Sequence, residues 1–140
     1  METFNWIYKD KEIIDGDTEG YSSFVYIITN LVSGRQYIGK KILQSLRKKI
    51  IKGKSKRVLT ESDWKKYYGS CLELQNDVKK HGKENFKREI LRFCTTKSEA
   101  SYFELFYQLE NHVLLKPKSF YNGYIGAKIH GSNLKNVYLE

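Results

Sequence analysis

With 140 residues, of which 40% are hydrophobic and 14% aromatic, the chain is long enough for one domain with a core, too short for two, and not a disordered tail. Cys71 and Cys94 form no CxxC pair, which excludes a disulfide framework and a cysteine-rich zinc site. No apolar run approaches the roughly 20 residues of a membrane span, which excludes a membrane partner and predicts a cytoplasmic protein. The net charge of +9, from 25 basic and 16 acidic residues, indicates a polyanionic partner.

The first third of the chain predicts two hairpins. Residues 6–8 and 12–14 flank a polar turn and predict a short hairpin, followed by a loop at 15–20. Phe24–Thr29 is β-branched and aromatic, residues 30–34 supply a turn, and 36–39 return as a second strand. We expect an N-terminal hairpin extension over residues 1–22 and a main region over 23–124 within one compact domain.

The middle of the chain predicts two helices joined by basic and aromatic segments. The apolar residues Ile42, Leu43, Leu46 and Ile50 recur at helical spacing, which predicts a helix over 42–51 with Arg47 at the edge of its buried face. Residues 52–57 show no periodicity and indicate a mobile basic loop. Residues 64–69 are aromatic up to a glycine, and 72–81 predict a helix ended by Gly82.

The last third predicts a strand and the longest helix. Residues 86–94 are a strand candidate with Phe86, Arg88 and Ile90 on one face. Thr96 and Glu99 match a capping box, and the helical spacing that follows is expected to continue to near Pro117. Residues 118–124 indicate a turn or an extended piece, and 125–140 are interpreted as a C-terminal tail.

The positive charge is concentrated in one segment. Residues 20–60 hold ten basic residues and no acidic one, leaving 15 basic residues against all 16 acidic ones elsewhere. Nucleic acid is the commonest polyanion that a soluble domain meets. The residues predicted to contact DNA are Lys40, Lys41, Lys48, Lys49, Lys52, Lys54, Lys56 and Arg57.

The same segment carries side chains suited to phosphodiester hydrolysis, which needs an activated nucleophile and stabilisation of charge on the phosphoryl and leaving oxygens. Tyr26 or Tyr37 can orient or deprotonate a water molecule if lysines and a metal lower the phenol pKa. Arg47 can hold a phosphate through its planar fork of donors. Glu104 can anchor one hard divalent cation, since Mg²⁺ often takes only one or two carboxylates.

The order of these residues resembles the GIY-YIG nuclease family. The run Phe24-Val25-Tyr26 is followed, eleven residues after Tyr26, by Tyr37-Ile38-Gly39. Further landmarks resemble the family's remaining segments in order. They are Arg47 at the catalytic arginine, His81-Gly82 with Phe86, Ile90 and Leu91 at the "kyG…F…il" segment, Glu104 at the metal-binding glutamate, and Tyr121-Asn122 at the closing "YN" pair.

The chain resembles the family over residues 23–123, and within the family it is most similar to the small Seg-like endonucleases of tailed bacteriophages. The resemblance implies an α/β (α+β) fold built on a small three-stranded antiparallel sheet flanked by helices, and cleavage of DNA, as a homing-type or DNA-processing nuclease. It implies that Glu104 binds Mg²⁺ or Mn²⁺, and that the protein acts in the host cytoplasm if a phage encodes it. A homodimer is a candidate assembly. The catalytic residues that the resemblance implies are Tyr26, Tyr37, Arg47, Glu104 and Asn122.

Two departures from the family pattern leave alternatives open. Phe24 replaces the glycine of the first motif, and no histidine occurs before His81, so Tyr67, Tyr68 and Lys40 are further candidates for the general base. The paired tyrosines are also compatible with simple cross-strand packing. The alternative function is a non-catalytic basic module that binds nucleic acid on the same fold. Target recognition is expected from the N-terminal hairpin, the basic segment or a dimer partner.

Overall fold

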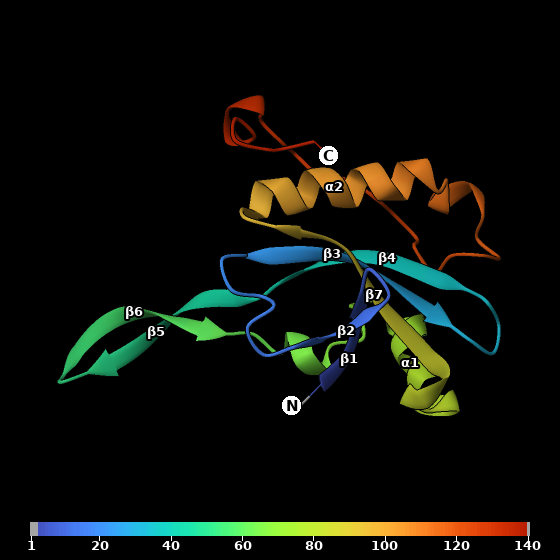
Figure 1. Cartoon of the computed structure of the whole chain (residues 1–140), viewed down its shortest axis with the longest axis horizontal. Coiled ribbons are helices and arrows are strands. Elements are labelled where there is room, and N and C mark those ends of the chain that lie inside the picture. The colour runs from blue at the N-terminus through green and yellow to red at the C-terminus, as the bar shows by residue number, and fades with distance from the viewer. Residues whose placement is uncertain (1–2, 140) are drawn as a thin grey trace.

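The centre of the protein is a five-stranded mixed sheet. The computed structural model describes residues 3–139, so the ends of the predicted extension and tail, at residues 1–2 and 140, lie outside it. The strand order is β2 (Lys11–Ile14), β1 (Thr3–Tyr8), β7 (Phe86–Cys94), β3 (Ser23–Asn30) and β4 (Gln36–Ile42). The sheet is covered on one face by α2 (Lys97–Glu110), while α1 (Leu72–His81) packs on the other (Figure 1).

The expected α+β class is confirmed, but the expected three-stranded sheet is too small. The three predicted strands β7, β3 and β4 are present and antiparallel, and they form only part of the sheet. The N-terminal hairpin adds two more strands, because β1 pairs in parallel with β7 through Trp6 opposite Arg88. Trp6 is fully buried and Ile13 nearly so, and β7 together with the aromatic core provides the surface that buries them.

Strand β3 supplies side chains to both cores, because its residues alternate between the two faces of the sheet. Phe24, Tyr26 and Ile28 pack with Trp6 and Trp64 on the α1 side. On the other side, Val25 of β3 and Ile38 of β4 pack beneath Ala100 and Phe103 of α2. The site residues of β3 and β4 are therefore held on a strand pair that is buried from above and below.

The helix ends follow their caps. Thr96 accepts a hydrogen bond from the backbone N–H of Glu99 (3.1 Å) and so starts α2 as predicted. Gly82 follows α1 with φ at +88°, also as predicted. The expected extension of α2 to near Pro117 is wrong, because α2 ends at Glu110 and His112, with φ at +52°, turns the chain into a short 3₁₀ turn at Val113–Leu115.

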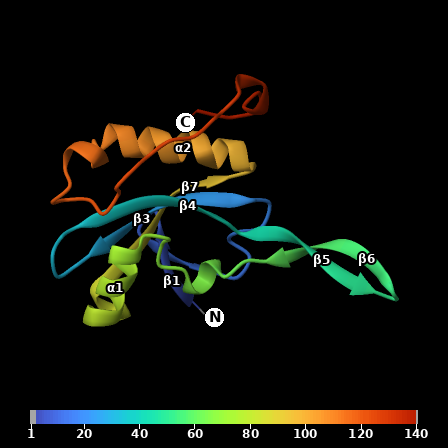
Figure 2. The same ribbon diagram turned by 180° about the vertical axis from the view of Figure 1, so that it is seen from behind.

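The predicted helix over 42–51 and the predicted loop over 52–57 are both wrong. Strands β5 (Gln44–Ile51) and β6 (Lys54–Glu61) form a two-stranded antiparallel ribbon that projects from one end of the molecule (Figures 1 and 2). Lys52 and Gly53, with φ at +51° and +75°, make the two-residue turn that joins them. Leu46 and Ile50 are 62% and 81% exposed, so no core exists against which a helix could bury them.

The segment after α2 returns along the open edge of the sheet. The Gln36 N–H donates to Ser119 O (2.9 Å), and the Tyr121 N–H donates to Gln36 O (2.8 Å), so the predicted extended piece lies beside β4. Beyond it the chain crosses α2 and forms a 3₁₀ turn at Gly131–Asn133 (Figure 2). Other 3₁₀ turns lie at Trp64–Lys66 and Lys83–Asn85. Within residues 3–139, no helix has the length and apolar character of a membrane span.

Candidate active site

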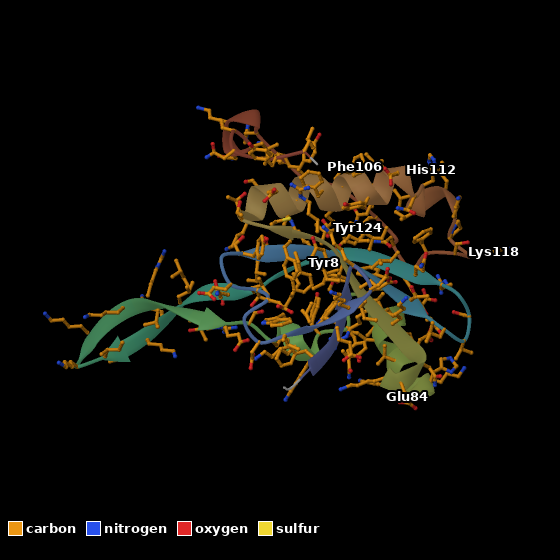
Figure 3. The ribbon with its side chains drawn as sticks, in the orientation of Figure 1. Tyr8, Glu84, Phe106, His112, Lys118 and Tyr124 are labelled. Atoms are coloured by element: carbon orange, nitrogen blue, oxygen red, sulfur yellow. The ribbon has the colours of Figure 1, made fainter. Side chains whose placement is uncertain are left out.

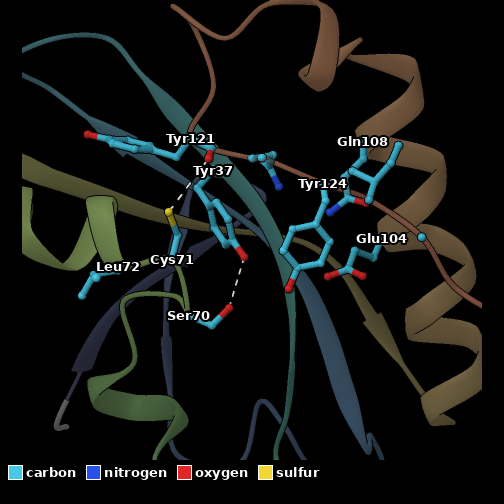
Figure 4. A pocket seen from close by; sticks show the side chains of 12 residues that line it. Tyr37, Ser70, Cys71, Leu72, Glu104, Gln108, Tyr121 and Tyr124 are labelled. Atoms are coloured by element: carbon cyan, nitrogen blue, oxygen red, sulfur yellow. Dashed lines mark hydrogen bonds between the residues drawn. The ribbon is translucent and has the colours of Figure 1, made fainter.

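A pocket of about 430 Å³ opens where the edge strand β4 meets α2, the start of α1 and the segment after Phe120 (Figure 4). Tyr37 comes from β4, Glu104 and Gln108 come from α2, and Asn122 and Tyr124 come from the returning segment. Ser70, Cys71 and Leu72 close the α1 side. Four regions distant in sequence thus contribute polar side chains to one concave surface, as ligand sites commonly require.

The two motif tyrosines lie side by side, as predicted, but only Tyr37 lines the pocket. Their ring centroids are 6.2 Å apart. The Tyr37 hydroxyl is within hydrogen-bonding distance of Ser70 Oγ (3.2 Å), whereas Tyr26 is 1% exposed and also contacts the Tyr67 ring edge-on. Tyr26 therefore forms the buried support behind Tyr37.

The packing of Tyr26 and Tyr37 leaves no room for a side chain at position 39, so this arrangement requires Gly39. It pairs with Tyr26 across the β3–β4 ladder, and the Tyr26 phenol lies directly over it. A methyl group at Gly39 would lie 2.7 Å from Tyr26 Cζ and 3.0 Å from Tyr37 Cε2. The glycine of the second motif thus lets the two phenols approach the backbone of β4.

Both phenols remain protonated in this environment. Burial, followed by the charges of Tyr67 and Tyr37, raises the pKa of Tyr26 well above its ordinary value. Burial also raises the pKa of Tyr37, although the hydrogen bond with Ser70 lowers it in part. A phenol with a raised pKa donates a hydrogen bond at neutral pH, which suits orientation of a water molecule or of a phosphate oxygen better than removal of a proton.

Glu104 is a half-buried carboxylate that faces the pocket (Figure 4). Burial raises the pKa of its carboxyl group, and the charge and backbone of Lys40 oppose part of the rise. Among the described residues it forms no ion pair, and no group of three or more His, Cys, Asp or Glu side chains gathers anywhere in residues 3–139. A single unpaired carboxylate fits a hard divalent cation that keeps most of its water ligands.

Asn122 is held by the backbone of β4. Its Oδ1 accepts from the Ile38 N–H (3.1 Å), and its Nδ2 donates to Ile38 O (2.8 Å). Gln108 Nε2 donates to the same carbonyl (3.1 Å). Asn122 and Gln108, both buried, thus fix β4 against α2 and the returning segment, which makes Asn122 a positioning residue for Tyr37 and Glu104.

The two lysines after the second motif have different surroundings. Lys40 is exposed, and its Nζ donates to Ser101 Oγ on α2 (2.6 Å). Lys41 lies over the Tyr67 ring (4.0 Å) and pairs with Asp63 (2.6 Å). The hydrogen bond from Lys41, followed by its charge and that of Arg47, holds the pKa of Asp63 below its usual range despite some burial. Lys40 is thus placed beside Glu104, while Lys41 is engaged by Asp63.

The sequence predicted Arg47 at the edge of a buried helix face, but the structure places it exposed on β5 opposite Val58. It is absent from the pocket lining and lies at the base of the ribbon near Asp63. The other predicted DNA contacts are exposed on the same ribbon and its turn. They are Lys48, Lys49, Lys52, Lys54, Lys56 and Arg57. The structure brings Tyr37, Glu104 and Asn122 together and places Arg47 and the cations of residues 48–57 on a separate element.

Among the pocket residues that were not predicted from the sequence are Ser70, Cys71, Gln108 and Tyr124. Gln108 follows Glu104 by four residues and so shares its helix face, a signal that the sequence does contain. Tyr124 is 88% exposed and lies between Tyr37 and Glu104 in the close-up view (Figure 4). The sequence offers no comparable signal for Ser70, whose contact with Tyr37 depends on how α1 packs.

Comparison with known sequences identifies the family. The sequence model described as "Putative endonuclease segE, GIY-YIG domain" matches residues 6–125. The chain is 33% identical over 99 residues to the "Putative endonuclease segE" of Enterobacteria phage T4, covering 71% of this chain and 39% of that protein. It is 30% identical over 104 residues to the "Putative endonuclease segD" of the same phage, covering 74% and 38%.

These matches confirm the resemblance predicted from the motifs. The chain spans less than two fifths of the length of either relative. No solved structure matches significantly. We therefore infer any function more specific than the family assignment from the geometry of the pocket.

Proposed function

This chain belongs to the segE-type GIY-YIG domain family, and we propose from that premise that it is a metal-dependent endonuclease that hydrolyses phosphodiester bonds in DNA. The observation that carries the proposal is the pocket in which the half-buried, unpaired carboxylate of Glu104 shares one surface with the Tyr37 phenol. A carboxylate kept partly out of water without an ion-pair partner is costly unless a ligand supplies positive charge.

Glu104 would hold the cation, and the raised pKa of its carboxyl group indicates a site that gains from a positive charge. A bound Mg²⁺ or Mn²⁺ would neutralise charge on the phosphoryl oxygens and lower the pKa of a coordinated water. Asn122 and Gln108 hold Glu104 and Tyr37 at fixed separation by clamping Ile38. Because the site is fixed before substrate arrives, little reorganisation is needed during the reaction.

Tyr37 would donate a hydrogen bond to the attacking water or to a phosphate oxygen, since its pKa is raised and the phenol is neutral. The water oxygen forms a bond to phosphorus as the bond from phosphorus to one sugar oxygen breaks. One proton leaves the water, and one is taken up by the departing oxygen. Lys40, beside Glu104, and Arg47, at the base of the ribbon, would bind the phosphates on either side of the scissile bond.

The test is digestion of supercoiled plasmid by the chain with Mg²⁺, Mn²⁺, Ca²⁺ or EDTA. The proposal expects nicked or linear product with Mg²⁺ or Mn²⁺ and intact plasmid with EDTA. Cleavage that continues in EDTA would overturn the role of the metal.

The alternative, a DNA-binding module without catalysis, is favoured by one observation, the absence of Arg47 from the pocket lining. It predicts retention of plasmid on a gel, weakening with salt, and no cleavage with any of the metals. The same digest, run beside a gel-shift assay, separates the two functions.

A further inference from the structure

The β5–β6 ribbon stands apart from the rest of the fold. The ribbon is anchored at its base, where the Leu43 N–H donates to Ser22 O (2.9 Å) and the Ser62 N–H donates to Leu43 O (2.8 Å). Within the described part of the chain, no side-chain hydrogen bond or ion pair connects residues 46–59 to the body. Figure 3 shows side chains projecting from both sides of the ribbon into solvent. A two-stranded ribbon alone is marginally stable in water, so this one contributes little to the core.

The pairing register places like charges opposite each other. Lys48 pairs with Arg57, and the next position pairs Lys49 with Lys56. Like charges directly opposite destabilise a strand pair, and no acid within the described residues forms an ion pair with these four side chains. A polyanion would remove the repulsion, so the ribbon carries a charge pattern that a phosphate backbone relieves.

The two faces of the ribbon differ, because directly opposed residues share a face and successive residues alternate. One face carries Arg47, the Lys49–Lys56 pair and Lys54, with Ile51 and Val58. We call this the Arg47 face. The other face carries the Lys48–Arg57 pair and the apolar side chains of Leu46, Leu59 and Ile50, which are 61% to 81% exposed. We call this the Leu46 face. The Arg47 face is the more cationic and holds the ribbon arginine that lies nearer the base of the ribbon.

We propose that the ribbon is a DNA-reading arm that enters the major groove of a duplex with its Arg47 face toward the DNA, so that a duplex whose phosphate lies in the pocket continues along β5 and β6. A two-stranded ribbon fits a major groove that is about 12 Å wide. From Arg47 to the Ile51–Lys54 pair at the tip, four residues at about 3.3 Å each span about 13 Å. At about 3.4 Å per base pair, the arm covers roughly four base pairs on one side of the cut.

The inference rests on the proposed function for the identity of the ligand, duplex DNA, and for nothing else. Its test is therefore a binding measurement without catalysis, by fluorescence anisotropy of a labelled 30-base-pair duplex in EDTA. A chain that binds and never cuts would refute the proposed nuclease and leave the arm standing. A chain that cuts while the ribbon variants bind normally would refute the arm alone.

Two double variants remove the same charge from neighbouring positions on opposite faces. Lys49→Ala/Lys56→Ala alters the Arg47 face, and Lys48→Ala/Arg57→Ala alters the Leu46 face. The first is expected to weaken binding at least tenfold and to lower the slope of log affinity against log salt by about two. The second is expected to weaken binding less than threefold. Equal losses would overturn the choice of face, and no loss in either variant would overturn the arm. Both double variants alter the same two strands. Unfolding of the ribbon would therefore weaken DNA binding equally in both variants and would count as equal losses.

The groove is tested by competition on the parent chain. Methyl green, which occupies the major groove, is expected to displace the chain from the duplex, and netropsin, which occupies the minor groove, is not. The reverse result would overturn entry into the major groove. Equal affinity for the duplex and for either of its single strands would overturn a duplex-reading arm.

Discussion

The pocket and the ribbon hold their polar side chains in opposite ways. In the pocket, Asn122 and Gln108 are buried and bonded to Ile38, and Tyr37 contacts Ser70. On the ribbon, the cations are exposed and, among the described residues, have no ion-pair partner. Chemistry on phosphorus needs side chains fixed before substrate arrives, whereas contacts to a phosphate backbone tolerate long, mobile cations. We therefore expect changes in the pocket to alter rate and stability, and changes on the ribbon to alter affinity.

The largest expected effect that separates the two regions is on the cleavage rate of Tyr37→Phe. Loss of the phenol donor is expected to lower the single-turnover rate about 100-fold, with duplex affinity within twofold of the parent. The matched control is Tyr102→Phe, on α2, 44% exposed and outside the pocket. A Tyr37→Phe chain that cuts at the parental rate would remove Tyr37 from the chemistry.

A second test asks whether the pocket is held by its clamp. Asn122→Ala removes two hydrogen bonds and leaves the buried N–H and C=O of Ile38 with fewer partners. The free energy of unfolding is expected to fall by about 2 kcal/mol, measured by denaturant unfolding. Asn76→Ala, at an exposed position of α1, is expected to change it by less than about 0.5 kcal/mol. Equal stability of the two variants would show that Asn122 does not secure β4.

The pH dependence of stability tests the burial of Glu104. Its pKa is raised in the folded chain, so the neutral carboxyl group is favoured by folding, and this contribution is present at low pH and lost as pH rises through the folded pKa. In EDTA, Glu104→Gln is expected to melt about 2 °C above the parent at pH 8 and to converge with it near pH 4. A variant that melts below the parent at pH 8 would mean that the carboxylate is well compensated without metal.

The smallest expected effect compares two glycine turns. Gly53 in the ribbon turn and Gly34 in the β3–β4 turn have φ at +75° and +81°, and at both positions the space that an added methyl group would enter is free of other atoms to 4 Å. Alanine at either site costs about 1 kcal/mol of backbone strain. Gly34→Ala is expected to lower global stability by that amount, while Gly53→Ala loosens only the ribbon and weakens DNA binding a few-fold. Global destabilisation by Gly53→Ala would show that the ribbon is part of the cooperative fold.

The sequence predicted the elements whose signals are local. The strands around Tyr26 and Tyr37, the cap at Thr96 and the end of α1 at Gly82 all have their causes within a few residues. The region after Leu43 was predicted wrongly, because the spacing of Leu46 and Ile50 suits a helix only where another surface covers them. The turn at Lys52-Gly53 and the β-branched residues beside it carried the correct signal.

The pocket was predicted in part. The order of the motifs identified Tyr37, Glu104 and Asn122, which the structure brings to one surface. The two hydrogen bonds between Asn122 and Ile38 join residues 84 positions apart, and the single hydrogen bond from Gln108 to Ile38 joins residues 70 apart. No local pattern encodes such contacts, so the positioning role of Asn122 required the fold. Sequence spacing likewise could not reveal that Tyr26 is buried behind Tyr37.

We propose that cleavage depends on Glu104 and a divalent cation in this pocket. The most direct measurement is the single-turnover cleavage rate against Mg²⁺ concentration for the parent, Glu104→Gln and the control Glu110→Gln, which alters an exposed residue of the same helix. We expect saturable cleavage by the parent and the control, and a rate at least about 100-fold lower for Glu104→Gln at every Mg²⁺ concentration, with duplex affinity retained. Parental cleavage by Glu104→Gln would contradict the proposal.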